Sequence, residues 1–263
     1  MDLGLKDKVV LVAAASKGLG YGIARALAAE GARVSICSRD REAVHAAAEQ
    51  IAADFGVQAL PFACDVLYED QIAAWVKFTT AQWGESIHGL VANAGGPPSL
   101  VLHEASDAQW LGAFELTLLS TVHMIRAALP HMENGSAILT VTSSTTKEPV
   151  AGLGLSTVMR AGVVGMVKVY ADELAPRGIR VNNLAPGRIL TDRIVHLDQI
   201  NATRSQSTVE EVRAKSEAAV PLKRLGTIDE FGRAAAFLLS PAASYTTGAT
   251  LRVDGGAMRS IGI

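Results

Sequence analysis

The chain has 263 residues, of which 49% are hydrophobic and 19% charged, an ordinary composition for a globular protein. The formal net charge is −2 and the basic residues form no blocks, so nucleic-acid-binding and membrane-surface proteins are not expected. The first ten residues lack the features of a signal peptide, and no apolar run has the length of a membrane span. We therefore expect a cytoplasmic protein, and no metal site is predicted.

The two cysteines, Cys37 and Cys64, each lie in a short apolar run. A disulfide between them is one alternative. Two reduced, buried thiols are favoured, because a cytoplasmic protein rarely keeps a disulfide.

Short apolar runs alternate with longer segments of helical periodicity along the whole chain. The runs predicted as strands are residues 9–15, 32–38, 58–66, 89–95, 137–143, 179–186 and 249–256. Helices are predicted between them, for example at 20–31, 41–56 and 69–84. Strands that are apolar throughout are typical of a parallel sheet buried on both faces. The pattern predicts an α/β fold, a single-domain Rossmann-type doubly wound parallel sheet of about seven strands over residues 1–263.

One stretch interrupts this alternation. Residues 188–220 are polar, amphipathic and longer than a usual connection. Because this insertion follows the end of a predicted strand, we expect it to form a lid.

The sequence AAASKGLG at 13–20 joins the first predicted strand to the first predicted helix. A Gly-rich turn of this kind exposes backbone N–H groups at a helix N-terminus and suits a pyrophosphate. The match to G-x-G-x-x-G is partial, because Ala14 stands where a first glycine is expected. A plain tight turn is the alternative.

The end of the second predicted strand indicates which dinucleotide is preferred. Folds that prefer NAD usually place Asp or Glu here, whereas this chain has Ser38 followed by Arg39. Arg39, together with Lys17 of the preceding turn, would neutralise a 2′-phosphate. We therefore predict NADP(H) rather than NAD(H); the alternative is that both side chains are solvated surface charges.

Six short segments occur in a familiar order: AAASKGLG (13–20), DV (65–66), NAG (93–95), VTSS (141–144), IRVNNLAPGRILTD (179–192) and TGATLRVDGG (247–256). Together they resemble the short-chain dehydrogenase/reductase superfamily, particularly its 3-oxoacyl-carrier-protein-reductase-like branch, over nearly the whole chain. The resemblance implies an NADP-dependent oxidoreductase and cofactor contacts at Ser16, Lys17, Gly18, Leu19, Gly20, Asp65, Val66, Asn93, Ala94, Gly95, Pro186, Gly187, Ile189 and Thr191. Helix capping and tight turns are alternative roles for several of these residues.

The resemblance also implies catalytic positions, at which this chain is unusual. The superfamily uses an Asn–Ser–Tyr–Lys set, and Ser143 matches its serine. The tyrosine position, thirteen residues later, is Ser156, the lysine position is Arg160, and the asparagine position is Thr117. The four tyrosines of the chain lie elsewhere.

These replacements change the available chemistry. A serine hydroxyl is a far weaker acid than a phenol, whose pKa is about 10. Arginine stays charged and does not relay a proton, although its fork still grips ribose hydroxyls. In isolation, Ser156 and Arg160 would be interpreted as a helix cap and a surface charge. Their spacing of four residues places them on one helix face.

Three functions accommodate this site. In the first, Ser143 and Ser156 polarise a substrate oxygen, Arg160 stabilises negative charge and water supplies the proton, with Lys147, Glu148 or His196 as possible helpers. In the second, the substrate is an imine or enone that needs no enzymic phenol. In the third, the protein binds NADP without turnover, as a sensor or scaffold subunit. We favour the first two, acting on a small to medium substrate, because the nicotinamide segment and the lid are retained.

The predicted helix at 157–174 is apolar over much of its circumference and therefore needs cover on more than one side. We expect a homo-oligomer, a tetramer or a dimer. Cover by the lid or a neighbouring helix of the same chain is the alternative.

Overall fold

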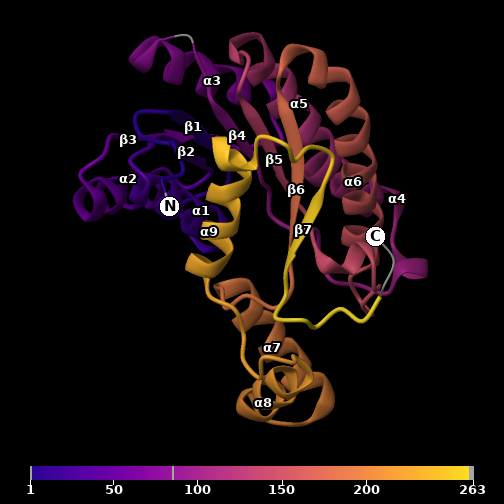
Figure 1. The fold of residues 1–263 in the computed structure, drawn as a ribbon. Coiled ribbons are helices and arrows are strands. Elements are labelled where there is room, and N and C mark those ends of the chain that lie inside the picture. Colours follow the sequence, from indigo (N-terminus) through magenta and orange to yellow (C-terminus); the bar gives the residue numbers. More distant parts are fainter. Residues whose placement is uncertain (1, 85, 261–263) are drawn as a thin grey trace.

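The computed structural model describes residues 2–84 and 86–260 and contains a seven-stranded sheet in the order β3-β2-β1-β4-β5-β6-β7 (Figure 1). All neighbouring strands pair in parallel. The strands are β1 Val9–Val12, β2 Arg33–Ser38, β3 Ala59–Ala63, β4 Gly89–Ala92, β5 Ala137–Val141, β6 Arg180–Pro186 and β7 Thr250–Val253. The direction of strand order reverses between β1 and β4, which confirms the predicted doubly wound fold.

Helices cover both faces of the sheet. They are α1 Gly18–Ala29, α2 Arg41–Phe55, α3 Glu69–Trp83, α4 Asp107–Phe114, α5 Ser120–Ala128, α6 Gly154–Leu174, α7 Asp192–Ser205, α8 Val209–Ala219 and α9 Ile228–Leu239. α1, α2 and α9 pack on one face, and α3, α5 and α6 pack on the other (Figure 1).

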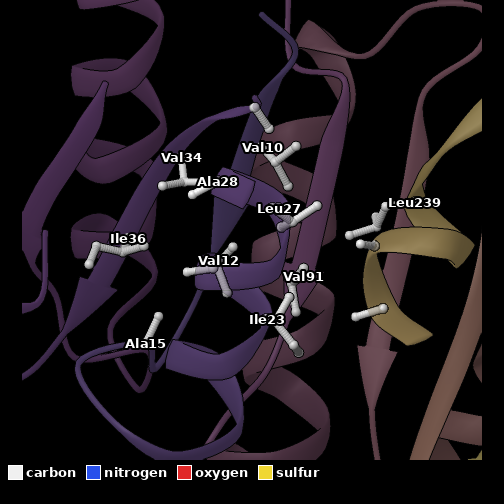
Figure 2. Packing of buried hydrophobic residues seen from close by; sticks show 14 of the residues in the cluster. Val10, Val12, Ala15, Ile23, Leu27, Ala28, Val34, Ile36, Val91 and Leu239 are labelled. Atoms are coloured by element: carbon white, nitrogen blue, oxygen red, sulfur yellow. The ribbon is translucent and has the colours of Figure 1, made fainter. Parts of the chain in front are cut away.

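Alternating side chains of each strand enter two separate cores. In β1, Val10 and Val12 belong to the core under α1 and α9, which Figure 2 shows, and Val9 and Leu11 belong to the core under α3 and α6. All four are at most 2% exposed. Because both faces are buried, the central strands β1 and β4 carry no polar side chain, and this apolar continuity made them recognisable in the sequence.

The predicted strands are too long at their carboxyl ends. The structure ends β1 at Val12, β4 at Ala92 and β5 at Val141, whereas the predictions extend to 15, 95 and 143. The predictions for β3 and β7 likewise extend to 66 and 256, beyond Ala63 and Val253. The apolar composition continues after the strand, but the backbone turns away: Ala14, for example, has φ +50°. These extra residues form the loops of the candidate site.

The insertion at 188–220 forms the helix pair α7 and α8, which lies beyond the sheet (Figure 1). Asp198 of α7 is completely buried and is bound by Arg188 of the preceding loop and by Arg213 of α8, the latter at 2.6 Å. Two guanidinium groups thus compensate the buried carboxylate and join the two helices.

Three other expectations concern the remainder of the fold. Cys37 and Cys64 are free and buried, as expected. Within the described ranges, no helix is long and apolar enough to cross a membrane. α6 buries Val163 and Val167, of which Val167 belongs to the core under α3 and α6, but Val158 and Val169 stay 46% and 56% exposed. The described residues therefore do not cover this helix on every side.

Candidate active site

The predicted site residues follow the carboxyl ends of different strands. In a parallel sheet these ends meet at one edge, so residues far apart in sequence gather there. Asn93, just after β4, makes the link directly: its Nδ2 donates to the carbonyl oxygens of Ala13 (3.2 Å) and Ala14 (3.5 Å). The end of β4 is thereby fastened to the Gly-rich turn after β1, at the point where strand order reverses.

The Gly-rich turn leaves the N-terminus of α1 open. Gly18 has φ +63°, and a Cβ on Gly20 would lie 2.3 Å from the carbonyl oxygen of Ala14, so both positions require glycine. Lys17, which precedes α1, makes no side-chain capping bond, and the first turn holds no acidic residue. Among the residues that the structure describes, the first amide groups of α1 therefore have no side-chain acceptor, as a phosphate-binding helix start requires.

The two basic residues predicted for the 2′-phosphate have different surroundings. Arg39 is exposed just beyond β2, next to Ser38, whose Oγ donates to the carbonyl oxygen of Asp40. The Nζ of Lys17 is 2.9 Å from Asp192, the first residue of α7. Lys17 therefore joins the Gly-rich turn to the helix pair, a contact that the sequence did not indicate.

The remaining predicted cofactor residues lie along the same edge. Asp65 does not cap α3, because its Oδ1 accepts from the N–H of Leu67 in a local turn. Thr191 caps α7, and a Cβ on Gly18 would lie 3.7 Å from its methyl carbon. Val66 and Ile189 are buried, Ser16, Leu19, Ala94, Pro186 and Gly187 are half-buried, and Gly95 is exposed. The loop after β6 thus lies against the Gly-rich turn.

Ser143 follows β5, and its hydroxyl oxygen accepts two hydrogen bonds. The donors are the N–H and the Oγ1 hydroxyl of Thr145, at 3.2 and 3.1 Å. Ser143 donates in neither bond, so its own proton is free for a substrate oxygen. The two donors also increase the polarity of this O–H group.

Ser156 and Arg160 both lie in α6, which begins at Gly154, three residues earlier than predicted. Ser156 is therefore inside the first turn and does not cap the helix. The Nε of Arg160 donates to the Oγ of Ser156 at 3.2 Å, which confirms that the two share a helix face. Arg160 is only 8% exposed, so the surface-charge alternative is wrong.

Arg160 also joins two strand ends. Its Nη1 donates to the carbonyl oxygen of Val141 at 2.7 Å, and its Nη2 to that of Gly95 at 3.3 Å. With Ser156, these bonds use three of the five guanidinium N–H groups and leave two for other acceptors. Burial, and to a smaller extent the charge of Arg193, lowers the pKa of Arg160 to about 10. The side chain therefore remains a cation at pH 7.

Thr117 lies where the helical chain between α4 and α5 widens into a π-helical turn, Glu115–Leu119. Turns of this type often occur at functional sites. Thr117 is 3% exposed, and among the described residues its Oγ1 has no hydrogen-bond partner. A buried hydroxyl without a partner is the environment in which an ordered water is found.

Arg193 is a residue that sequence reasoning missed. It lies in the first turn of α7, and its Nη2 donates to the carbonyl oxygen of Pro97 at 3.2 Å. Glu148, in contrast, accepts from the N–H groups of Arg259 and Ser260, so it fixes the C-terminal segment. His196 is exposed on α7.

Comparisons with known proteins show the family to which the chain belongs. Residues 13–258 match the family described as enoyl-(acyl carrier protein) reductase. Tropinone reductase-like 3 from Erythroxylum coca is 34% identical over 252 residues, 95% of this chain and 93% of that protein. The 3-oxoacyl-(acyl-carrier-protein) reductase of Staphylococcus epidermidis is 31% identical over 253 residues, 95% of this chain and 98% of its own.

A solved structure resembles the whole fold. It is L-sorbose reductase from Gluconobacter frateurii, in complex with NADPH and L-sorbose, which superposes with a TM-score of 0.94 at 29% identity and covers 99% of this chain and 100% of that one. The chain therefore belongs to the short-chain dehydrogenase/reductase superfamily, in the branch that contains the 3-oxoacyl-carrier-protein reductases.

Proposed function

We propose that the chain is an NADP(H)-dependent oxidoreductase that transfers hydride to or from a small to medium carbonyl, imine or enone compound. The observation that carries this proposal is the position of Arg160. Its guanidinium group donates to Ser156, to the end of β5 at Val141 and to the loop after β4 at Gly95. A charged group and a hydroxyl are thereby held beside the strand ends where this fold binds its nucleotide.

The residues present fit a dinucleotide. The uncapped start of α1 suits the pyrophosphate, Arg39 suits a 2′-phosphate, and the two remaining N–H groups of Arg160 suit ribose hydroxyls. NADPH in the similar L-sorbose reductase supports the same choice of coenzyme. When bound, the reduced nicotinamide supplies a hydride, that is one proton and two electrons, and becomes NADP⁺.

Two hydroxyl groups orient the acceptor. Ser143 and Ser156 both accept their hydrogen bonds from the protein, so each retains an O–H to donate to one substrate oxygen. Negative charge develops on that oxygen as the carbon is reduced, and donors fixed in place stabilise it. The cationic Arg160 behind Ser156 adds to this stabilisation.

The proton comes from water rather than from a side chain. Ser156 is too weak an acid to supply it at neutral pH, and Arg160 remains charged. The unpartnered hydroxyl of Thr117 offers a place for an ordered water. An enone is suited to this site, because its enolate takes the proton from water at carbon; an imine carbon accepts hydride without any proton on oxygen.

The loss of the tyrosine and lysine also favours a second candidate, a subunit that binds NADP without turning it over. Purified protein distinguishes the two candidates. We expect NADPH absorbance to decrease with at least one class in a panel of ketones, imines and enones, with formation of the reduced product. NADPH binding without oxidation across the panel would contradict the enzyme proposal.

We also propose a homo-oligomer, supported by the exposed Val158 and Val169 of α6. Light scattering after gel filtration is expected to give the mass of a dimer or tetramer. A monomer at micromolar concentration would contradict this proposal.

A further inference from the structure

We propose that the substrate carries a carboxylate group, bound by Arg193 beside the loop that follows β4, where the positive charge of Arg160 adds to the attraction. This inference rests on the proposed function and names the class of substrate: an oxo acid, or an enone or imine that bears an acid group.

Both guanidinium groups are bound to one short loop. Arg160 donates from Nη2 to the carbonyl oxygen of Gly95, and Arg193 donates from Nη2 to that of Pro97. Gly96 lies between these two residues, and a Cβ there would be 3.7 Å from the Nη2 of Arg193. Two cationic groups thus approach the same three residues, one from α6 and one from α7.

The positive charge at this loop is uncompensated. Among the described residues, neither Arg160 nor Arg193 forms an ion pair with a carboxylate; the protein acceptors of both are neutral oxygens. The nearest acidic neighbour along the chain, Asp192, is paired with Lys17 at 2.9 Å. The charge of Arg193 also opposes protonation of Arg160, so the two groups repel.

The helix start adds to the same field. Arg193 occupies the first turn of α7, where the helix dipole is positive and a cation is unfavourable. Its side chain is exposed, and its Nη2 donates to the carbonyl oxygen of Pro97. An anion beside Arg193 would be attracted by both guanidinium groups and by the dipole.

The geometry favours a carboxylate on a small molecule. Arg160 is bonded to Ser156, so the cationic loop borders the hydroxyl groups that orient the reacting oxygen. A compact planar anion matches the parallel N–H groups of a guanidinium. Binding of the acid group would place the reducible carbon of a short oxo acid at the two serines.

The experiment compares matched acids and esters at saturating NADPH. The probes are 2-oxo-4-phenylbutanoate and 4-oxopent-2-enoate, each beside its methyl ester. For the wild-type protein we expect kcat/KM for the better acid to exceed that for its ester by at least about tenfold. Arg193→Met is expected to lower the acid value about 10- to 100-fold, mainly through KM, and to leave the ester value within about twofold. Arg193→Lys, which keeps the charge, is expected to give a kcat/KM for the acid between those of the wild-type protein and Arg193→Met.

The matched control is Arg204→Met, which removes the same charge from the last turn of the same helix. This variant is expected to leave kcat/KM unchanged for both the acid and the ester. If Arg193→Met lowers kcat/KM equally for the acid and the ester, Arg193 only connects α7 to the loop, and the inference is wrong. Equal rates for acid and ester in the wild-type protein would contradict it as well. A loss of NADPH affinity in Arg193→Met, measured by fluorescence titration, would assign the side chain to the coenzyme instead.

A binding measurement separates this inference from the proposed function. We expect calorimetry to detect binding of 4-phenylbutanoate to the complex of the wild-type protein with NADP⁺. The wild-type complex should bind 4-phenylbutanamide at least about tenfold more weakly, and the Arg193→Met complex should bind 4-phenylbutanoate at least about tenfold more weakly. If no compound is reduced but this pattern holds, the anion site stands and the oxidoreductase proposal fails. If a compound is reduced but the acid binds no better than the amide, the oxidoreductase proposal stands and the anion site is wrong.

Discussion

Arg160 donates a hydrogen bond to Ser156 across 3.2 Å, and both residues lie on one face of α6. The same guanidinium bonds to the carbonyl oxygens of Val141 and Gly95. The bond therefore does more than join two residues of one helix: it fixes a hydroxyl group at a defined place relative to the ends of β4 and β5. At the two positions that the resemblance assigns to the superfamily's tyrosine and lysine, serine and arginine form a connected pair.

The hydroxyl group of Ser143 is expected to contribute strongly to kcat. Ser143→Ala should lower kcat about 10²- to 10³-fold, because it removes a donor to the developing oxyanion. NADPH affinity, measured by fluorescence titration, should stay within about twofold, since the residue is placed at the substrate oxygen. Ser144→Ala is the neighbouring control and should retain activity. Full activity of Ser143→Ala would remove this residue from the site.

Arg160→Met should weaken NADPH binding at least about tenfold, because it removes the donors to the ribose and leaves two backbone carbonyl oxygens without their partner. Arg160→Lys should weaken it less, since the charge remains but one ammonium does not reproduce all three bonds. Calorimetric titration with NADPH is the measurement. Unchanged affinity in Arg160→Met would mean that Arg160 serves only the fold.

Coenzyme preference should depend mainly on Arg39. Arg39→Asp is expected to raise the Kd for NADPH at least about tenfold and to lower the Kd for NADH, since a carboxylate accepts from a ribose 2′-hydroxyl and repels a 2′-phosphate. Lys17→Ala should have a smaller effect, because Lys17 is already paired with Asp192. Lys77→Asp on the exposed side of α3 controls for net charge. NADPH preference that survives Arg39→Asp would count against this assignment.

Restoring the usual pair tests the register directly. The double variant Ser156→Tyr/Arg160→Lys should reduce simple ketones with NADPH at a rate at least about tenfold above that of the parent chain, because a phenol of lowered pKa becomes available as the acid. Each single variant is the control and should gain less. A folded double variant that binds NADPH but gains no ketone reduction would show that these are not the tyrosine and lysine positions.

His88 should make stability depend on pH. Its Nδ1 accepts from the N–H of Val9 at 3.2 Å, and burial, with the charges of Lys8 and Arg33, lowers the pKa of its imidazole below 6.5. Below pH 6.5 the unfolded chain therefore binds more protons, and the free energy of unfolding falls as pH decreases toward the lowered pKa. Above pH 6.5 both states are neutral and this dependence is absent.

Denaturant unfolding at several pH values measures this effect. His88→Gln should reduce the decrease in the free energy of unfolding below pH 6.5. His45→Gln, at an exposed position of α2, should leave that decrease unchanged. The same slope in His88→Gln and the wild-type protein would rule out His88 as its source.

Much of the fold could be predicted because both faces of the sheet are buried. Side chains such as Val10 and Leu11 enter different cores, so strands such as β1 and β4 are apolar without interruption. Their ends could not be predicted from composition, since residues such as Ala13 and Ala14 are apolar but already belong to the turn. That Ser156 and Arg160 share a helix face followed from their spacing of four residues, whereas their catalytic roles were implied only by the resemblance to the superfamily.

The contacts of α7 could not be predicted in the same way. Lys17–Asp192 and the contact of Arg193 with the loop after β4 join residues far apart in sequence. No periodicity links such positions, and each charge taken alone resembles an ordinary solvated side chain. One sequence signal was present: a basic residue in the first turn of a capped helix, where the dipole disfavours it.

The central claim is that Ser143, Ser156 and Arg160 form the reduction site without a phenol. A crystal structure of the complex with NADP⁺ tests it most directly. We predict that the hydride-accepting carbon of the nicotinamide lies within about 5 Å of the hydroxyl oxygens of Ser143 and Ser156, with Arg160 bonded to the adjoining ribose. A nicotinamide more than about 5 Å from both hydroxyl groups would contradict it.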